Sequence, residues 1–145
     1  MSEAEDCFRK GLLQKTESNR AFALQDLKRA EFFLKEAREL AELKKQEMTL
    51  IALYNAVFHS ARSLLYKDGV KERSHYCLQK YVEEKYEKTG ALDSNDLALF
   101  ELLRASRNNV QYGLSSAAME ESLSELCNKT RKLIEKTSKL IEQTR

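Results

Sequence analysis

Residues 52–69 have the sequence ALYNAVFHSARSLLYKDG, and this stretch decides the fold class. Its apolar residues recur every three or four positions, which is the spacing of one buried face of an α-helix and not of a β-strand. Gly69 follows the last of these residues, and glycine is common just past the end of a helix. The stretch therefore predicts a helix from about Gln46 to Lys67 with one side in the protein core.

The same apolar spacing recurs along most of the chain, which has no proline and only four glycines. This composition favours helices throughout. We expect further helices over residues 19–44, 75–86, 94–112 and 117–143, with Ser74 capping the helix at 75–86. Short connections make neighbouring helices antiparallel, so the predicted fold class is all-α, an up-and-down bundle of four to five helices.

The chain has the length of a single domain, which we place over residues 1–145. Residues 1–17 are expected to add a short helical segment that packs on the bundle. No stretch shows the sustained alternation of a half-buried strand. In the helix at 94–112, we assign Leu99, Leu102, Ser106 and Val110 to the core side.

The formal net charge is only +2, which argues against a polybasic tail for nucleic acid or membranes. The apolar run at 49–58 is too short to span a membrane, and the first ten residues contain no signal-peptide core. Cys7, Cys77 and Cys127 are far apart and odd in number, so we expect reduced cysteines and a cytoplasmic protein. Two histidines and scattered cysteines give no ligand spacing, so we predict neither a metal nor a cofactor.

The helix at 46–67 carries a polar stripe of Asn55, His59, Arg62 and Tyr66, spaced so that all four lie on one face. One interpretation is a groove that faces another helix or a second subunit, where His59 exchanges a proton near neutral pH. The other is that Asn55 and His59 form hydrogen bonds within a core or interface, while Arg62 points to water. Both interpretations remain open at this point.

Residues 102–114, LLRASRNNVQYGL, contain Arg104, Arg107 and Asn108 on one flank, with no acidic residue between positions 101 and 120. Guanidinium groups match phosphate oxygens in a bidentate fork, so the stretch predicts a local phosphate site. Pairing of these arginines with carboxylates of another helix is an equal alternative. His75 and Cys77 are assigned to capping and to the core, respectively, and not to chemistry.

Four segments resemble the HEPN family in matching order, from about residue 8 to residue 143: KGLLQKT at 10–16, the stretch at 52–69, ERSHYCL at 72–78, and LLRASRNNVQYGL. The likeness is to its small stand-alone prokaryotic members. The resemblance implies a helical bundle that commonly forms a homodimer and is often encoded beside a minimal nucleotidyltransferase. Many relatives are toxins of toxin–antitoxin pairs and act as metal-independent ribonucleases.

The family's ribonuclease motif is an arginine and a histidine with four to six residues between them, near the end of the fourth helix. Arg107 with Asn108 matches the first half, but the positions for the histidine hold Tyr112, Gly113 and Leu114. Tyrosine, with an ordinary pKa near 10, is a poor base at neutral pH. Loss of a positioned acid–base group typically removes about two to four orders of magnitude of rate.

We therefore predict a non-catalytic or weakly active HEPN protein, a dimeric nucleotide- or RNA-binding or interaction module paired with a minimal nucleotidyltransferase in a toxin–antitoxin-like system. The candidate phosphate- and nucleotide-binding residues are Arg104, Arg107, Asn108, Tyr112, Asn55 and His59. The alternative is a metal-independent RNA endonuclease toxin with an atypical site, in which His59 approaches Arg107 within a subunit or across a dimer. A third interpretation is a helical interaction subunit whose polar stripes only specify the dimer.

Overall fold

In a computed structural model, which describes residues 1–111 and 122–143, the chain forms six α-helices and a two-stranded sheet. The elements are α1 (Glu3–Arg9), β1 (Leu13–Lys15), α2 (Arg20–Glu42), α3 (Gln46–Asp68), β2 (Val70–Glu72), α4 (His75–Val82), α5 (Ser94–Gln111) and α6 (Leu123–Glu142), with one π-helical turn, η1 (Glu83–Glu87), that prolongs α4. The all-α fold class is confirmed. The predicted start of the last helix near residue 117 lies outside the described residues.

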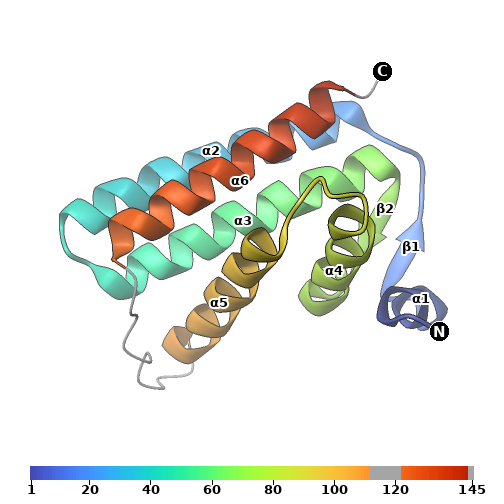
Figure 1. Cartoon of the computed structure of the whole chain (residues 1–145), viewed down its shortest axis with the longest axis horizontal. Coiled ribbons are helices and arrows are strands. Elements are labelled where there is room, and N and C mark those ends of the chain that lie inside the picture. Colours follow the sequence, from blue (N-terminus) through green and yellow to red (C-terminus); the bar gives the residue numbers. More distant parts are fainter. Residues whose placement is uncertain (112–121, 144–145) are drawn as a thin grey trace.

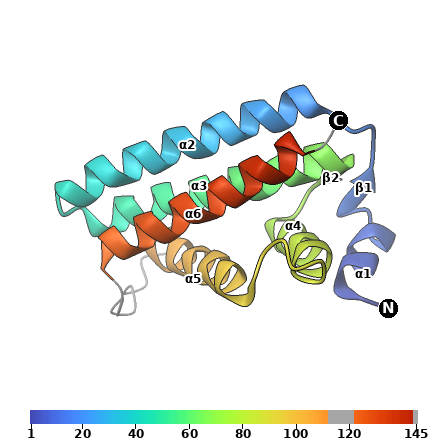
Figure 2. The same ribbon diagram turned by 45° about the horizontal axis from the view of Figure 1, so that its top comes forward.

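The helix α3 lies at the centre of the arrangement. The three long helices α2, α3 and α6 run side by side (Figure 1), and the contact between α2 and α3 is the most extensive of any two elements. On another side of α3 lie α4 and α5, with α1 beyond α4 (Figure 2). Because α3 packs against four helices, most of its residues are buried.

Two predicted helix boundaries are confirmed. The helix α3 ends at Gly69, whose left-handed backbone, with a φ of 73°, is the conformation that glycine adopts at little cost. A Cβ atom at this position would lie 2.5 Å from the carbonyl oxygen of Thr16, so the close approach of the N-terminal segment also requires glycine. At the start of α4, the Ser74 hydroxyl accepts a hydrogen bond from the backbone N–H of Cys77 at 3.1 Å.

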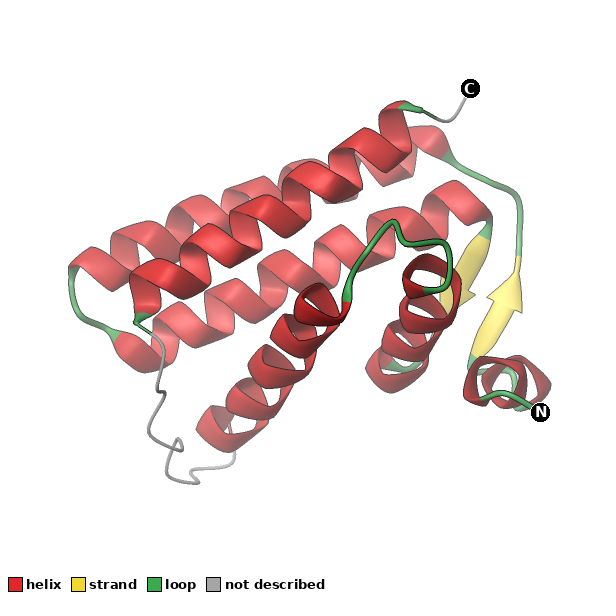
Figure 3. Ribbon diagram, viewed as in Figure 1, coloured by secondary structure: helices red, strands yellow, loops and turns green. Residues whose placement is uncertain are grey.

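The prediction of no strand was wrong at one place. Leu13–Lys15 pairs in antiparallel fashion with Val70–Glu72 (Figure 3), and the buried side chains of Leu13 and Val70 join the core. Strands of three residues are too short to show an alternating pattern in the sequence. The pairing fastens the N-terminal segment to the chain that leaves α3.

The prediction of reduced cysteines was wrong for two of the three. Cys7 of α1 and Cys77 of α4 form a disulfide, and only the docking of α1 on α4 brings residues 70 positions apart together. Cys127 is a buried free thiol, and burial raises its pKa. The argument from reduced cysteines for a cytoplasmic location therefore loses its basis. Within the described part of the chain, no helix has the length and apolar character needed to cross a membrane.

The predicted core side of α5 was wrong in part. Leu103 and Phe100 are buried with Leu99, whereas Leu102 remains 37% exposed. Ser106 is buried as predicted, and the side chain of Val110 lies outside the described set. Arg107 follows Leu103 by four residues, so it shares the edge of the buried face and points toward α3.

We expect the Cys7–Cys77 disulfide to stabilise the fold substantially. The chain-entropy model gives about 4 kcal/mol for a closed loop of 70 residues. Urea unfolding of the oxidised protein and of the protein in reductant should differ by an amount of this order. In a Cys7→Ala/Cys77→Ala variant, the reductant should have no effect, and equal stability of the oxidised and reduced wild type would contradict the expectation.

Candidate functional site

A buried carboxylate on α2 holds the polar stripe of α3. Asp26 is only 4% exposed. Arg62 donates to it twice, from Nε to Oδ2 at 2.6 Å and from Nη2 to Oδ1 at 2.9 Å, and the Nδ1–H of His59 donates to Oδ1 at 2.9 Å. The interpretation in which Arg62 points to water is therefore wrong, whereas His59 does form a hydrogen bond at a helix interface.

The ion pair between Asp26 and Arg62 remains charged. Burial alone would raise the pKa of the Asp26 carboxyl group, but the hydrogen bonds from Arg62 and His59 outweigh burial and lower the pKa. The hydrogen bond to Asp26 raises the pKa of Arg62 in return. Asp26 was not among the predicted site residues, although an acidic residue among the small and apolar residues of a helix face indicates that a cation lies opposite.

Aromatic rings surround this ion pair. The His59 ring stacks on Phe33, with centroids 5.4 Å apart and an interplanar angle of 10°, and meets the edge of Phe58 at 5.3 Å. The Arg62 guanidinium lies 5.3 Å from the centroid of Phe58 and 5.7 Å from that of Tyr66. These contacts orient both polar side chains, since each is held by a carboxylate and by a ring face.

The second histidine, His75, approaches the same rings from the start of α4. It stacks on Phe58 with a centroid distance of 4.2 Å, and its Nδ1 shares a hydrogen bond with the Tyr54 hydroxyl at 2.7 Å. The backbone at this point is set by the Ser74 cap of α4. The assignment of His75 to capping alone missed these contacts, because no spacing along the chain connects residue 75 with Tyr54 and Phe58.

Arg107 of α5 contacts the ring of Tyr54, which neighbours Phe58. Its guanidinium lies 5.1 Å from the centroid of Tyr54, so Arg107 and His75 pack against the same tyrosine. Burial, followed by the positive charges of Arg107, Arg62 and Arg104, lowers the pKa of His75. Burial also raises the pKa of the Tyr54 hydroxyl, which therefore stays protonated at neutral pH.

The two arginines of α5 differ in their partners. Arg104 forms an ion pair with Glu101 at 3.0 Å, so the positive potential predicted for this flank is partly neutralised there. The Arg104 Nε atom is buried without a hydrogen-bond partner among the described residues. Arg107 makes no ion pair with any residue in 1–111 or 122–143, and its guanidinium lies against the Tyr54 ring.

The remaining candidate residues are Asn55, Asn108, Tyr112 and His59. Asn55 lies one helical turn before His59, and Asn108 follows Arg107; both are half-buried. Tyr112 lies outside the described residues. His59 is engaged by Asp26 and Phe33, so the histidine that shares a ring with Arg107 is His75 and not His59.

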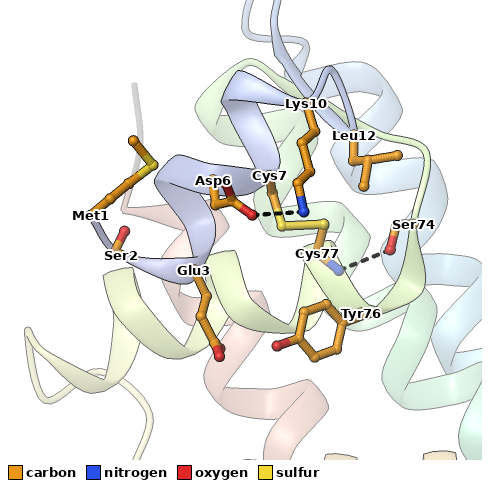
Figure 4. Close-up of a pocket in the computed structure, with 10 residues that line it drawn as sticks. All are labelled: Met1, Ser2, Glu3, Asp6, Cys7, Lys10, Leu12, Ser74, Tyr76 and Cys77. Carbon is orange, nitrogen blue, oxygen red and sulfur yellow. Dashed lines mark hydrogen bonds and ion pairs between the residues drawn. A yellow bond between two sulfur atoms is a disulfide. The ribbon is translucent and has the colours of Figure 1, made fainter.

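A cavity of about 450 Å³ lies between α1 and α4 (Figure 4), and its lining includes neither Arg104 nor Arg107. Its wall includes the disulfide, and its charged side chains form ion pairs: Lys10 with Asp6 at 3.0 Å, and Glu3 with Lys80 of α4 at 3.2 Å. The disulfide and the ion pair of Glu3 with Lys80 join α1 to α4, so this cavity belongs to the docking of α1. Within the described residues, no group of three or more histidine, cysteine, aspartate or glutamate side chains is arranged to hold a metal ion.

A family model for the HEPN domain matches residues 24–140. The chain belongs to the HEPN domain family. A search of curated proteins returned no match. The HEPN match runs from α2 to α6, so it includes Asp26, His59, His75 and Arg107 but not α1, β1 or Cys7. In this HEPN domain, the histidine that packs on the same tyrosine as Arg107 is His75 of α4. It does not come from the positions after the arginine, where the family's motif has its histidine.

We expect Asp26→Asn to destabilise the HEPN fold by about 2–3 kcal/mol at pH 7, because a half-buried Arg62 loses its charged partner. Urea unfolding measures the change. Asp93→Asn, which removes an exposed partner of Lys136 but keeps the Oδ1 that accepts from the backbone N–H of Asp96, is the control and should destabilise the fold much less.

The same pair predicts a dependence on pH. The pKa of Asp26 is lower in the folded protein than in the unfolded chain. Its stabilisation is therefore complete above the ordinary carboxyl pKa of about 4 and is lost as the pH falls through the folded value. The wild type and Asp26→Asn should thus converge in stability at acidic pH, and equal stability at pH 7 would contradict the role of the ion pair.

Proposed function

We propose that this HEPN protein binds RNA or a nucleotide, with Arg107 holding a phosphate group. The observation that carries the proposal is the meeting of Arg107 and His75 on the ring of Tyr54, where α3, α4 and α5 come together. A guanidinium group matches phosphate oxygens, and an exposed imidazole face can stack on a base or donate a hydrogen bond. Membership of the HEPN family is consistent with nucleotide or RNA binding.

The surrounding charges support a preorganised anion site. Arg62 and Arg104 lie close enough to His75 to lower its pKa. Each of them is held by a carboxylate, Asp26 or Glu101, and so needs little reordering when a ligand binds. Arg107, which forms no ion pair within residues 1–111 or 122–143, then supplies the positive charge for a ligand.

The family resemblance extends the proposal to partners. We propose that Asn55, His59, Asn108 and Tyr112 border the binding surface, that the protein forms a homodimer, and that a minimal nucleotidyltransferase is its partner in a toxin–antitoxin-like system. These points rest on resemblance and not on contacts among the described residues. A single domain over residues 1–145 and a cytoplasmic location are likewise still predictions.

The binding proposal is tested by the fluorescence anisotropy of a labelled single-stranded RNA. Arg107→Ala should weaken binding about 10- to 100-fold, because a charge-assisted contact to phosphate is lost. The slope of log Kd against log salt concentration should fall by about 0.7 for each lost contact to a single strand. Arg131→Ala removes an exposed arginine of α6 that pairs with Glu135, and this control should bind like the wild type. Unchanged binding by Arg107→Ala would contradict the proposal.

A second candidate function is metal-independent cleavage of RNA with His75 as the base. The observation that favours it is the lowered pKa of His75 beside Arg107, because a neutral imidazole can accept a proton at pH 7. In the tautomer in which Nδ1–H donates to the Tyr54 hydroxyl, Nε2 carries the free lone pair, and this is the tautomer that the reaction requires.

The step that this geometry would perform is transesterification. Nε2 of His75 removes the proton from a ribose 2′-OH, and the 2′ oxygen attacks the adjacent phosphorus. The 5′ oxygen leaves and takes up a proton from water, which gives a 2′,3′-cyclic phosphate and a 5′-hydroxyl end. Arg107 would stabilise the negative charge that develops on the phosphorane.

Cleavage of a mixed RNA in EDTA separates this candidate from binding alone. If His75 is the base, His75→Gln should lower the rate at least about 100-fold. The wild-type rate should hold as the pH falls to about 6.5 and decrease only below it, since a lowered pKa keeps His75 neutral past the ordinary value. Equal cleavage by His75→Gln would exclude His75 and make His59 the next base to test, with His59→Ala.

A further inference from the structure

Aromatic rings and guanidinium groups continue from the Arg107 site across α3 onto α2. Tyr66, which lies beside Arg62, is met at 5.5 Å by the ring of Phe22. Phe33, which stacks on His59, lies under the guanidinium of Arg29 at 4.8 Å. The face of α2 that lies next to the polar stripe of α3 thus also carries aromatic side chains and an arginine.

We call this face the α2 stacking surface, and it consists of Phe22, Arg29, Phe32 and Phe33. Phe22, Arg29 and Phe33 recur at intervals of seven and four residues on one side of α2, and Phe32 adjoins them under Arg29 at 5.0 Å. Phe22 is 49% exposed and Phe32 is 46% exposed. Large rings that remain in water on a helix whose opposite side is well packed are typical of a binding surface.

The charge on this face favours a polyanion as the occupant. Asp26 lies between Phe22 and Arg29 on α2, but its carboxylate is paired with Arg62 and accepts a hydrogen bond from His59. Arg29 makes no ion pair among the described residues and covers two rings. A nucleic-acid strand supplies phosphates for Arg29 and Arg107 and bases for the rings between them, so it matches both kinds of side chain on this surface.

The ring contacts connect the two regions without a break. Arg107 lies on Tyr54, Tyr54 packs on Phe58 at 6.3 Å, and Phe58 lies beside Arg62. Arg62 and Tyr66 then lead to Phe22. Tyr54 and Phe58 are buried and lie beneath the surface, while the exposed ring of Phe22 is accessible to a ligand.

We infer that the α2 stacking surface binds the bases of single-stranded RNA whose phosphate is held by Arg107, so that the ligand is a strand of several nucleotides and not a mononucleotide. This inference rests on the proposed function, because Arg107 anchors the strand. Recognition by stacking is tolerant of sequence, since every base has a π-face.

The test compares two labelled oligouridylates, a dinucleotide and a strand of about 12 nucleotides, which lies within the usual range for single-strand surfaces. Phe22→Ala and Phe32→Ala should each weaken binding of the long strand about 5- to 100-fold and leave dinucleotide binding unchanged. Arg107→Ala should weaken both. Leu43→Ala is the matched control, because Leu43 is 66% exposed at the other end of α2 and lies outside the surface.

The outcomes separate this inference from the proposed function. If Arg107→Ala weakens both ligands while the phenylalanine variants bind like Leu43→Ala, the inference is overturned and the proposed function stands. If the wild type binds neither ligand, both are overturned. Light scattering and thermal unfolding accompany each measurement. The phenylalanine variants could stay folded and bind RNA normally but form a smaller oligomer than the wild type. That result would identify a contact between copies of the chain and overturn the inference.

Discussion

The buried carboxylate of Asp26 is the constraint on which the rest of the structure depends. A charge on the packing face of a helix is costly unless it is paired, and among the described residues its hydrogen-bond partners are Arg62 and His59 of α3. The pairing fixes how α2 and α3 lie against each other and orients Arg62 and His59. Because Arg62 in turn contacts Phe58 and Tyr66, the same ion pair positions the rings of the candidate site.

The site is completed by two helices that cross α3. The Ser74 cap starts α4 so that His75 lies on Phe58, and the buried Leu103 of α5 carries Arg107 onto Tyr54 one turn later. The disulfide at Cys77 ties the first turn of α4 to α1, outside the residues matched by the HEPN model. An arginine and a histidine thus meet on one aromatic group although the sequence motif that joins them in the family is incomplete.

Local spacing predicted the helices, because their apolar faces and caps are encoded within a few residues. It did not predict contacts between distant segments: the disulfide, the short strand pair, and the approach of His75 to Tyr54 all depend on how whole helices dock. The core side of α5 was misassigned because residues 97–103 are apolar on two faces, so their spacing does not select one. Asp26 carried a signal in its position, but only the structure identifies Arg62 as its partner.

The central claim is that a single strand of RNA lies over the junction of α3, α4 and α5. Photo-crosslinking to RNA that contains 4-thiouridine, followed by mass spectrometry of the digested protein, tests it most directly because it locates the ligand without a substitution. We expect crosslinks in peptides that contain Phe22, Phe32, His75 or Arg107. Crosslinks confined to the lysine-rich outer face of α6, around Lys132 and Lys139, would contradict it.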